Sequence, residues 1–79
     1  MAENLTIEYD HIGDILYITK VAPYRTQETE ELEDEVLARV NPETGALEGL
    51  EILFWSKRLA AGEKLVLPIE GTLRLAVEV

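Results

Sequence analysis

The chain has 79 residues, of which sixteen are acidic and seven basic, so its formal net charge is −9. A chain of this length supplies one hydrophobic core, which predicts a single small domain over residues 1–79. The negative charge argues against nucleic acid as a partner, because Lys and Arg side chains provide the affinity for phosphates. There is no cysteine for disulfides or thiolate metal sites. With no leader and no apolar run of membrane length, the sequence predicts a cytoplasmic protein that binds no membrane.

The N-terminal segment has the pattern of a β-hairpin. Leu5, Ile7 and Tyr9 alternate with polar residues, which predicts a strand with one face toward solvent. Turn-forming residues occupy positions 10–14, and β-branched and aromatic residues resume at 15–18. The two segments are predicted to pair as antiparallel strands.

The middle of the chain combines an acidic stretch with a second hairpin. From Pro23 to about Glu31 no apolar residue recurs at a fixed period, which predicts a loop. Strands are predicted at 36–40 and 47–53. Between them, positions 41–45 have Pro second and Gly last, as a tight turn requires.

Residues 54–61 are predicted to form a short helix. Trp55 and Leu59 lie one helical turn apart, and Gly62 stands where a C-terminal cap is favoured. Ser56 is expected to cap the N-terminus with its hydroxyl group.

Two further apolar stretches, 65–69 and 73–79, alternate on either side of Glu70-Gly71. They predict a C-terminal β-hairpin, weakened by Pro68, which cannot donate to a strand ladder. The predicted fold is therefore α+β, with a small antiparallel β-hairpin sheet, one short helix and a C-terminal hairpin. The pattern leaves open whether that last hairpin belongs to the same core or reaches a second copy.

The strongest charge feature is a run of six carboxylates in eight positions: Glu28, Glu30, Glu31, Glu33, Asp34 and Glu35. Three interpretations are open. The run can be a solvated edge or loop whose charges keep a strand from pairing, a surface for a basic protein, or a site for a hard cation. The spacing and the glycine of an EF-hand loop are missing, so no metal ligand is assigned.

His11 is the only histidine, so one chain cannot supply a two-histidine metal site. Beside Asp10 and Asp14 it has the neighbours of a general base oriented by a carboxylate, although its place in a turn favours an exposed loop residue. Neither a nucleophile nor an oxyanion donor is adjacent, and the chain has no glycine-rich phosphate loop. No catalytic or cofactor-binding residue is therefore assigned.

Large apolar residues near the C-terminus form the candidate homodimer interface. Phe54 and Trp55 stand at the end of a predicted strand, where such rings either close a core or anchor an interface. A domain this small has little material to cover them. The alternating residues Leu73, Leu75 and Val77 add to the apolar surface that a second copy would bury.

The order of several short segments resembles the small, mostly bacterial family catalogued as domain of unknown function 2283. The resemblance covers residues 5–59, with the Phe54-Trp55 pair bulkier than expected at that position. It is carried by Tyr9-Asp10, Asp14-Ile15-Leu16-Tyr17-Ile18, the acidic segment around 28–31, Val36-Leu37-Ala38-Arg39-Val40, Gly49-Leu50-Glu51-Ile52-Leu53 and Ser56-Lys57-Arg58-Leu59. It implies no established activity, no cofactor and no catalytic residue, while the occurrence of some relatives beside small toxin-like proteins keeps a partner-binding role open.

The leading hypothesis is a non-enzymatic protein-interaction module: a cytoplasmic homodimer whose acidic face binds a basic protein. The alternative is a small enzyme or metal-binding protein with a site formed across a dimer interface by His11, Asp10, Asp14 and Glu51. Outside such a site, Glu51 is expected to face solvent or to pair with Arg39 across the second hairpin.

Overall fold

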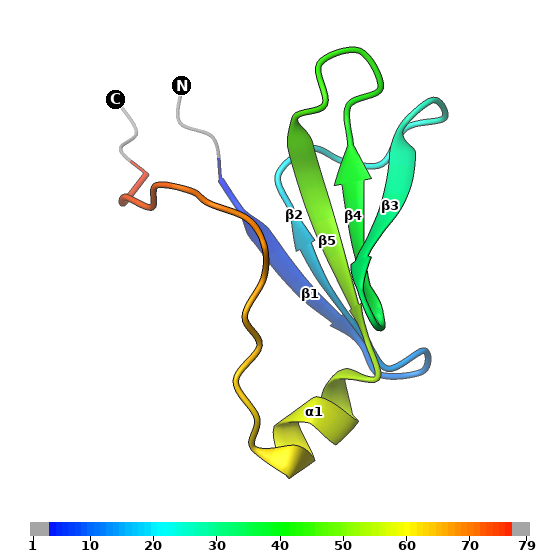
Figure 1. Ribbon diagram of the computed structural model, residues 1–79, viewed down its shortest axis with the longest axis vertical. Coiled ribbons are helices and arrows are strands. Elements are labelled where there is room, and N and C mark those ends of the chain that lie inside the picture. The colour runs from blue at the N-terminus through cyan, green and yellow to red at the C-terminus, as the bar shows by residue number, and fades with distance from the viewer. Residues whose placement is uncertain (1–3, 77–79) are drawn as a thin grey trace.

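The computed structural model describes residues 4–76 and contains one β-sheet followed by one helix (Figure 1). The strands are β1 (Thr6–Asp10), β2 (Ile15–Thr19), β3 (Glu28–Glu33), β4 (Val36–Val40) and β5 (Leu47–Leu53), and the helix is α1 (Trp55–Ala61). The predicted α+β class and the predicted short helix are confirmed.

The five strands form one antiparallel sheet in the order β1-β2-β5-β4-β3. The hairpins predicted for β1 with β2 and for β4 with β5 are both present. Strand β5 lies at the centre between β2 and β4, and β1 and β3 are the two edges. Consequently β1 and β3 each leave one side of their backbone unpaired within the sheet.

The hydrophobic core lies on one side of the sheet, which we call the apolar face. Directly paired residues of antiparallel strands share a face, and the row Ile18, Leu50, Ala38 crosses β2, β5 and β4. Val36 and Ile52 form the neighbouring pair and are at most 2% exposed. The period-two alternation of the sequence places these residues together, and the opposite side, which we call the polar face, carries the intervening residues.

Strand β3 replaces the loop that was predicted to extend from Pro23 to about Glu31. The prediction was wrong because β3 is an edge strand whose side chains are nearly all exposed, so it shows no apolar alternation. The register between β3 and β4 shifts at Glu31 and Glu33, and Leu32 at this bulge packs against the core cluster. One inward-facing side chain and backbone pairing with β4 are enough to define the strand.

Residues 63–76, which we call the arm, follow α1 without regular secondary structure. The predicted C-terminal hairpin is therefore not formed by the described residues, and residues 77–79 of that prediction lie outside them. Leu67 packs against the core cluster, which holds the first half of the arm on the apolar face. Because that half lies on the sheet and includes Pro68, which has no backbone donor, it does not pair with the second half. Figure 1 shows the arm running in extended form from α1 past the start of β1.

Candidate functional site

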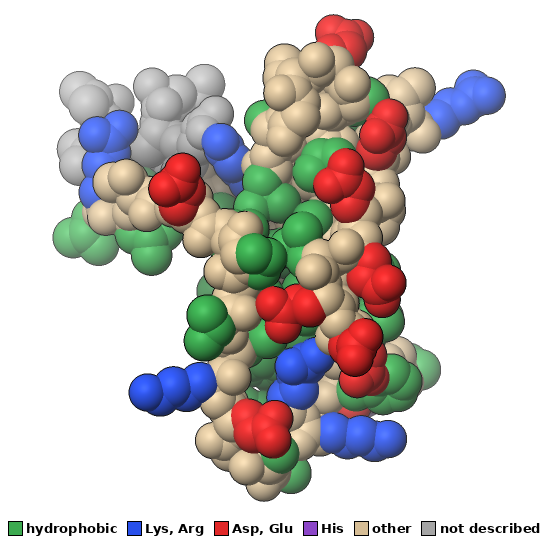
Figure 2. Space-filling view, viewed as in Figure 1, with side chains coloured by type: hydrophobic (Ala, Val, Ile, Leu, Met, Phe, Trp, Pro, Cys, Tyr) green, Lys and Arg blue, Asp and Glu red, His purple; other side chains and the backbone are tan. Residues whose placement is uncertain are grey.

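The six carboxylates of the predicted acidic run line β3 and the turn that follows it, which together we call the acidic edge. All six residues are exposed, and Figure 2 shows acidic side chains along the edge where β3 lies in Figure 1. Glu30 is paired with Ala38 of the apolar face, whereas Glu31 is paired with Leu37 of the polar face, so the charges project to both sides. Within residues 4–76, none of the six carboxylates forms a hydrogen bond or ion pair.

The backbone of the acidic edge is held firmly even though its carboxylates are uncommitted. Arg58 of α1 donates from Nη2 to the carbonyl oxygen of Asp34 at 2.8 Å. The Leu53 amide donates to the carbonyl oxygen of Glu35 at 2.8 Å, and Glu35 itself has a positive φ of 64°. The turn after β3 is thus attached to both the helix and the central strand.

A buried arginine organises the polar face. Arg39 is 4% exposed, donates from Nη2 to Thr19 Oγ1 at 2.9 Å, and places Nε 3.4 Å from Glu51 Oε2. The side chain crosses above Gly49, where a Cβ atom would lie 2.6 Å from Arg39 Cζ. The predicted pairing of Glu51 with Arg39 is confirmed, and the glycine makes it possible because only a residue without a side chain leaves this space.

Glu48 is the second buried charge on the polar side and is 7% exposed. It accepts hydrogen bonds from Tyr24 Oη at 2.6 Å, from Gln27 Nε2 at 3.0 Å and from Asn41 Nδ2 at 3.4 Å. The bond from Tyr24, followed by that from Gln27, lowers the pKa of Glu48, and the same bond raises the pKa of Tyr24 to about 12. Gln27 also accepts from Arg39 Nη1 at 3.4 Å, which joins the two buried charges into one network.

This network, consisting of Thr19, Tyr24, Gln27, Arg39, Asn41, Glu48 and Glu51, was not found from the sequence beyond the Arg39–Glu51 pair. Its members come from β2, β4, β5 and the two connecting loops. The one local signal of this network in the sequence was Glu48, a charged residue flanked by Leu47 and Gly49 in a predicted strand. Because the carboxylate of Glu48 is occupied by three donors, the network acts as a structural support.

Asp14 connects the β1–β2 turn to the start of α1. Its Oδ1 accepts from Tyr9 Oη at 2.7 Å and from the Ser56 amide at 2.9 Å, and its Oδ2 accepts from Ser56 Oγ at 2.7 Å. The hydrogen bond from Tyr9 is the main cause that lowers the pKa of Asp14 and raises that of Tyr9. The prediction that Ser56 caps α1 was wrong, because Phe54 is the N-cap residue and the carboxylate of Asp14 receives the helix amide.

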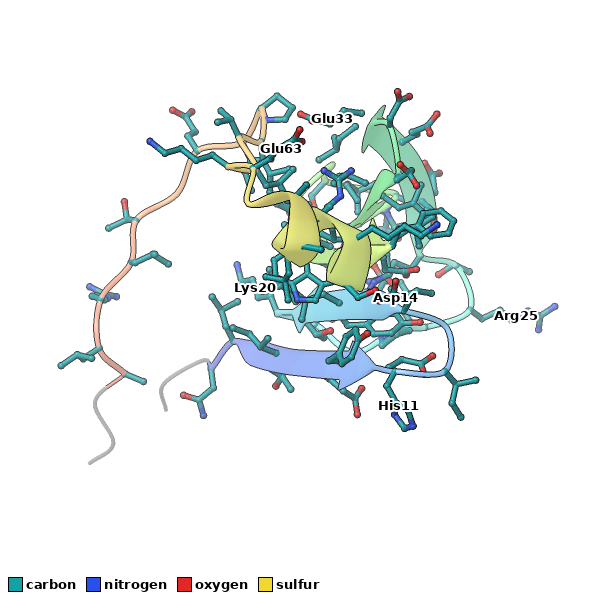
Figure 3. All side chains as sticks on the ribbon, turned by 90° about the horizontal axis from the view of Figure 1, so that it is seen from below. His11, Asp14, Lys20, Arg25, Glu33 and Glu63 are labelled. Atoms are coloured by element: carbon teal, nitrogen blue, oxygen red, sulfur yellow. The ribbon has the colours of Figure 1, made fainter. Side chains whose placement is uncertain are left out.

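The residues of the predicted alternative site do not come together within one chain. Figure 3 shows His11 pointing outward from the β1–β2 turn, whereas Asp14 lies toward α1. Asp10 accepts from the Ile12 and Gly13 amides of its own turn. Glu51 is engaged with Arg39. Residues 4–76 contain no group of three side chains that could hold a metal ion. A site completed across a dimer interface stays a prediction.

The predicted interface residues have different environments. Trp55 is half-buried, whereas Phe54 is 43% exposed and lies 5.0 Å from the Lys57 ammonium group. Leu73 and Leu75 of the arm are exposed, and Val77 lies outside the described residues.

A hollow between α1 and the start of the arm has a volume of about 240 Å³. It is smaller than the pockets of about 300–1,000 Å³ that hold small molecules. Its lining consists of Trp55, Arg58, Leu59, Gly62, Glu63, Lys64 and Leu65. This lining contains one carboxylate, that of Glu63, and no histidine.

Within the described residues, α1 is too short to cross a membrane, and no other helix is present.

Comparisons with curated proteins and with solved structures each returned no match. The model of a family described as protein of unknown function (DUF2283) matches residues 6–56, which is more than half of the chain. That segment begins with β1 and ends at Ser56, so it contains the whole sheet, the network around Arg39 and the Asp14 cluster. The chain therefore belongs to the DUF2283 family.

Proposed function

We propose that this domain is a non-enzymatic protein-interaction module that works as a homodimer and presents its acidic edge to a basic protein. The observation that carries the proposal is the acidic edge itself: six exposed carboxylates without partners among residues 4–76, on a backbone held by Arg58 and Leu53. Charges that are already fixed in place and uncommitted accelerate and orient the binding of an oppositely charged protein.

The spread of the carboxylates supports a protein partner over a cation. A hard cation needs several oxygens converging within about 2.6 Å of one point. The carboxylates of Glu30 and Glu31 leave opposite faces of β3, and the described chain forms no group of three potential ligands. An extended row of charges fits an extended basic surface instead.

The homodimer is supported by apolar surface that one chain leaves open. On β1, Ile7 is 68% exposed although it belongs to the apolar face, and Tyr9 is 43% exposed. Leu73 and Leu75 add further exposed leucines on the arm. Exposed apolar surface of this kind marks association sites. A cytoplasmic location stays a prediction.

The binding proposal is tested with a charge-neutral variant. Glu28→Gln, Glu30→Gln and Glu31→Gln are combined in one protein, and the control combines Glu43→Gln, Glu63→Gln and Glu70→Gln, which remove the same charge from exposed positions elsewhere. Proteins captured by the wild type from a bacterial lysate are purified, and their affinities for all three proteins are measured by calorimetry.

We expect a captured basic protein to lose at least about tenfold in affinity for the β3 variant, to keep its affinity for the control, and to bind more weakly as salt rises. The acidic-edge proposal is rejected if no captured protein distinguishes the two variants.

A further inference from the structure

The arm has the properties of a strand without a sheet. From Leu65 to Leu75 its apolar residues recur mostly at every second position, which is the pattern of a strand with one buried face. No backbone hydrogen bond joins residues 63–76 to another described residue. Leu73 is 85% exposed and Leu75 is 91% exposed. The second half of the arm, which we call the outer arm and which includes Leu73 and Leu75, therefore lacks a partner for both its backbone and its apolar face within the described chain.

The two edges of the sheet differ in their capacity to accept such a strand. Edge β3 carries glutamates on both faces and a bulge at Glu31 and Glu33, which are two devices that prevent strand addition. Edge β1 pairs with β2 in regular register over all five residues and has no bulge. Its apolar-face residues Ile7 and Tyr9, and Leu5 just before the strand, are more than 40% exposed. Strand addition is thus open at β1 and opposed at β3.

The chemical pattern of the outer arm matches that of β1. In Ile7-Glu8-Tyr9 a carboxylate stands between two apolar residues, and in Leu73-Arg74-Leu75 a guanidinium stands between two leucines. If Arg74 is placed opposite Glu8, these two charges meet on the polar face while the leucines lie beside Ile7 and Tyr9 on the apolar face. The match holds for either strand direction because both triplets have the same alternation.

We propose that the arm of each subunit adds to β1 of a second copy as a sixth strand, with Arg74 opposite the partner's Glu8. This inference rests on the homodimer of the proposed function and specifies its contact. A second copy is the occupant because the arm of a single chain passes the start of β1 and continues away from the sheet (Figure 1). Reciprocal exchange covers both β1 edges with one two-fold arrangement and leaves both acidic edges free.

The test uses two single charge reversals and their mixture. Glu8→Arg places two positive charges at each contact, and Arg74→Glu places two negative charges there. In the mixture of the two variants, each heterodimer contact again joins one positive and one negative charge, and the total charge equals that of two wild-type chains. Arg25→Glu, in an exposed loop, is the matched control for the charge change. Masses are measured by sedimentation velocity over a concentration series.

We expect each reversal alone to raise the dimer dissociation constant about tenfold or more, the mixture to restore dimers to the wild-type level, and Arg25→Glu to behave as the wild type. A chain ending at Gly71 should be a monomer whose circular dichroism spectrum retains the sheet. Restoration by mixing occurs only if the contact is between chains, because each variant retains its repulsion within one chain.

Three outcomes would overturn the arm exchange. If the wild type is a dimer and both reversals leave its dissociation constant unchanged, the arm is not the contact, while the homodimer stands. If both reversals weaken the dimer and mixing the two variants does not restore it, the arm pairs with β1 of its own chain. A wild type that is monomeric at every concentration removes the homodimer as well, and the binding of a basic protein to the acidic edge is still decided by the glutamine variants.

Discussion

The two faces of the sheet are closed by different kinds of interaction. Side chains such as Val36 and Ile52 pack on the apolar face, whereas the polar face is closed by hydrogen bonds and an ion pair around Arg39 and Glu48. The connection between β2 and β3 completes the polar face, since Tyr24 and Gln27 come from it. The apolar face is completed only in part, by Leu67 of the arm and by Leu32 of β3.

This difference shows how a short chain divides its covering material. A chain of 79 residues has too little apolar residue volume to cover both sides of a five-stranded sheet. A polar network needs few residues to bury one side, and it holds the connecting loop in one place. The remaining arm covers the centre of the other side and leaves β1 open, which is where we propose the second copy.

The largest expected effect comes from breaking the polar face at its centre. Arg39→Ala should cost about 3–5 kcal/mol of unfolding free energy, because Glu51 is left without its ion pair and Thr19 and Gln27 lose their donor. Urea unfolding followed by circular dichroism measures this loss. Arg39→Met, which keeps the apolar stem, should cost less, and a loss below about 1 kcal/mol for Arg39→Ala would contradict the central role of this residue.

The apolar face should respond almost as strongly to the loss of its most central side chain. Ile52→Ala removes a side chain that is 2% exposed and leaves a cavity, at an expected cost of about 3 kcal/mol in the same assay. Ile69→Ala is the control, since that side chain is 41% exposed and should cost less than about 1 kcal/mol. Equal losses for the two variants would mean that the arm is packed as tightly as the core.

Filling the space beneath Arg39 sharpens the comparison without removing any polar group. Gly49→Ala forces the guanidinium away from its position over β5 and should cost about 1–3 kcal/mol. Gly71→Ala is the matched control, because a Cβ atom there meets nothing within 4 Å. Unfolding of the two variants at low protein concentration is compared, and equal stability would show that Arg39 moves without cost.

The smallest expected effect is a change in pH dependence on the polar face. The pKa of Glu48 lies below its usual 4.5, so its contribution to stability is present above that pH and is lost as the pH falls. The pKa of Tyr24 is raised from 10.0 to about 12, so its contribution is present below pH 10 and is lost as the pH rises toward 12.

Tyr24→Phe should therefore lower stability at neutral pH and flatten the loss on both the acid and the alkaline side. Urea midpoints across the pH range measure this change. Tyr17→Phe is the control, because the Tyr17 hydroxyl has no hydrogen bond among residues 4–76. Unchanged pH profiles for Tyr24→Phe would separate Tyr24 from the titration of Glu48.

Local pattern alone determined much of the sheet. Alternation of apolar residues located β1 and β4, because a strand with one buried face repeats every two residues. β-Branched and aromatic residues located β2, and turn-forming residues placed the two hairpins. Gly62 was correctly predicted to end α1, since its φ of 68° is the conformation that glycine adopts most readily. The acidic run and the family resemblance were also visible in the sequence.

Tertiary structure alone decided the features that depend on distant residues. Edge strand β3 has no alternation because it buries almost nothing, and its pairing with β4 defines it. The bond from Gln27 to Glu48 spans 21 positions and that from Ser56 to Asp14 spans 42, and contacts so far apart leave no periodic signal. The arm alternates as a strand would, but a strand exists only where another backbone accepts its hydrogen bonds, and residues 4–76 of one chain provide no such backbone for the arm.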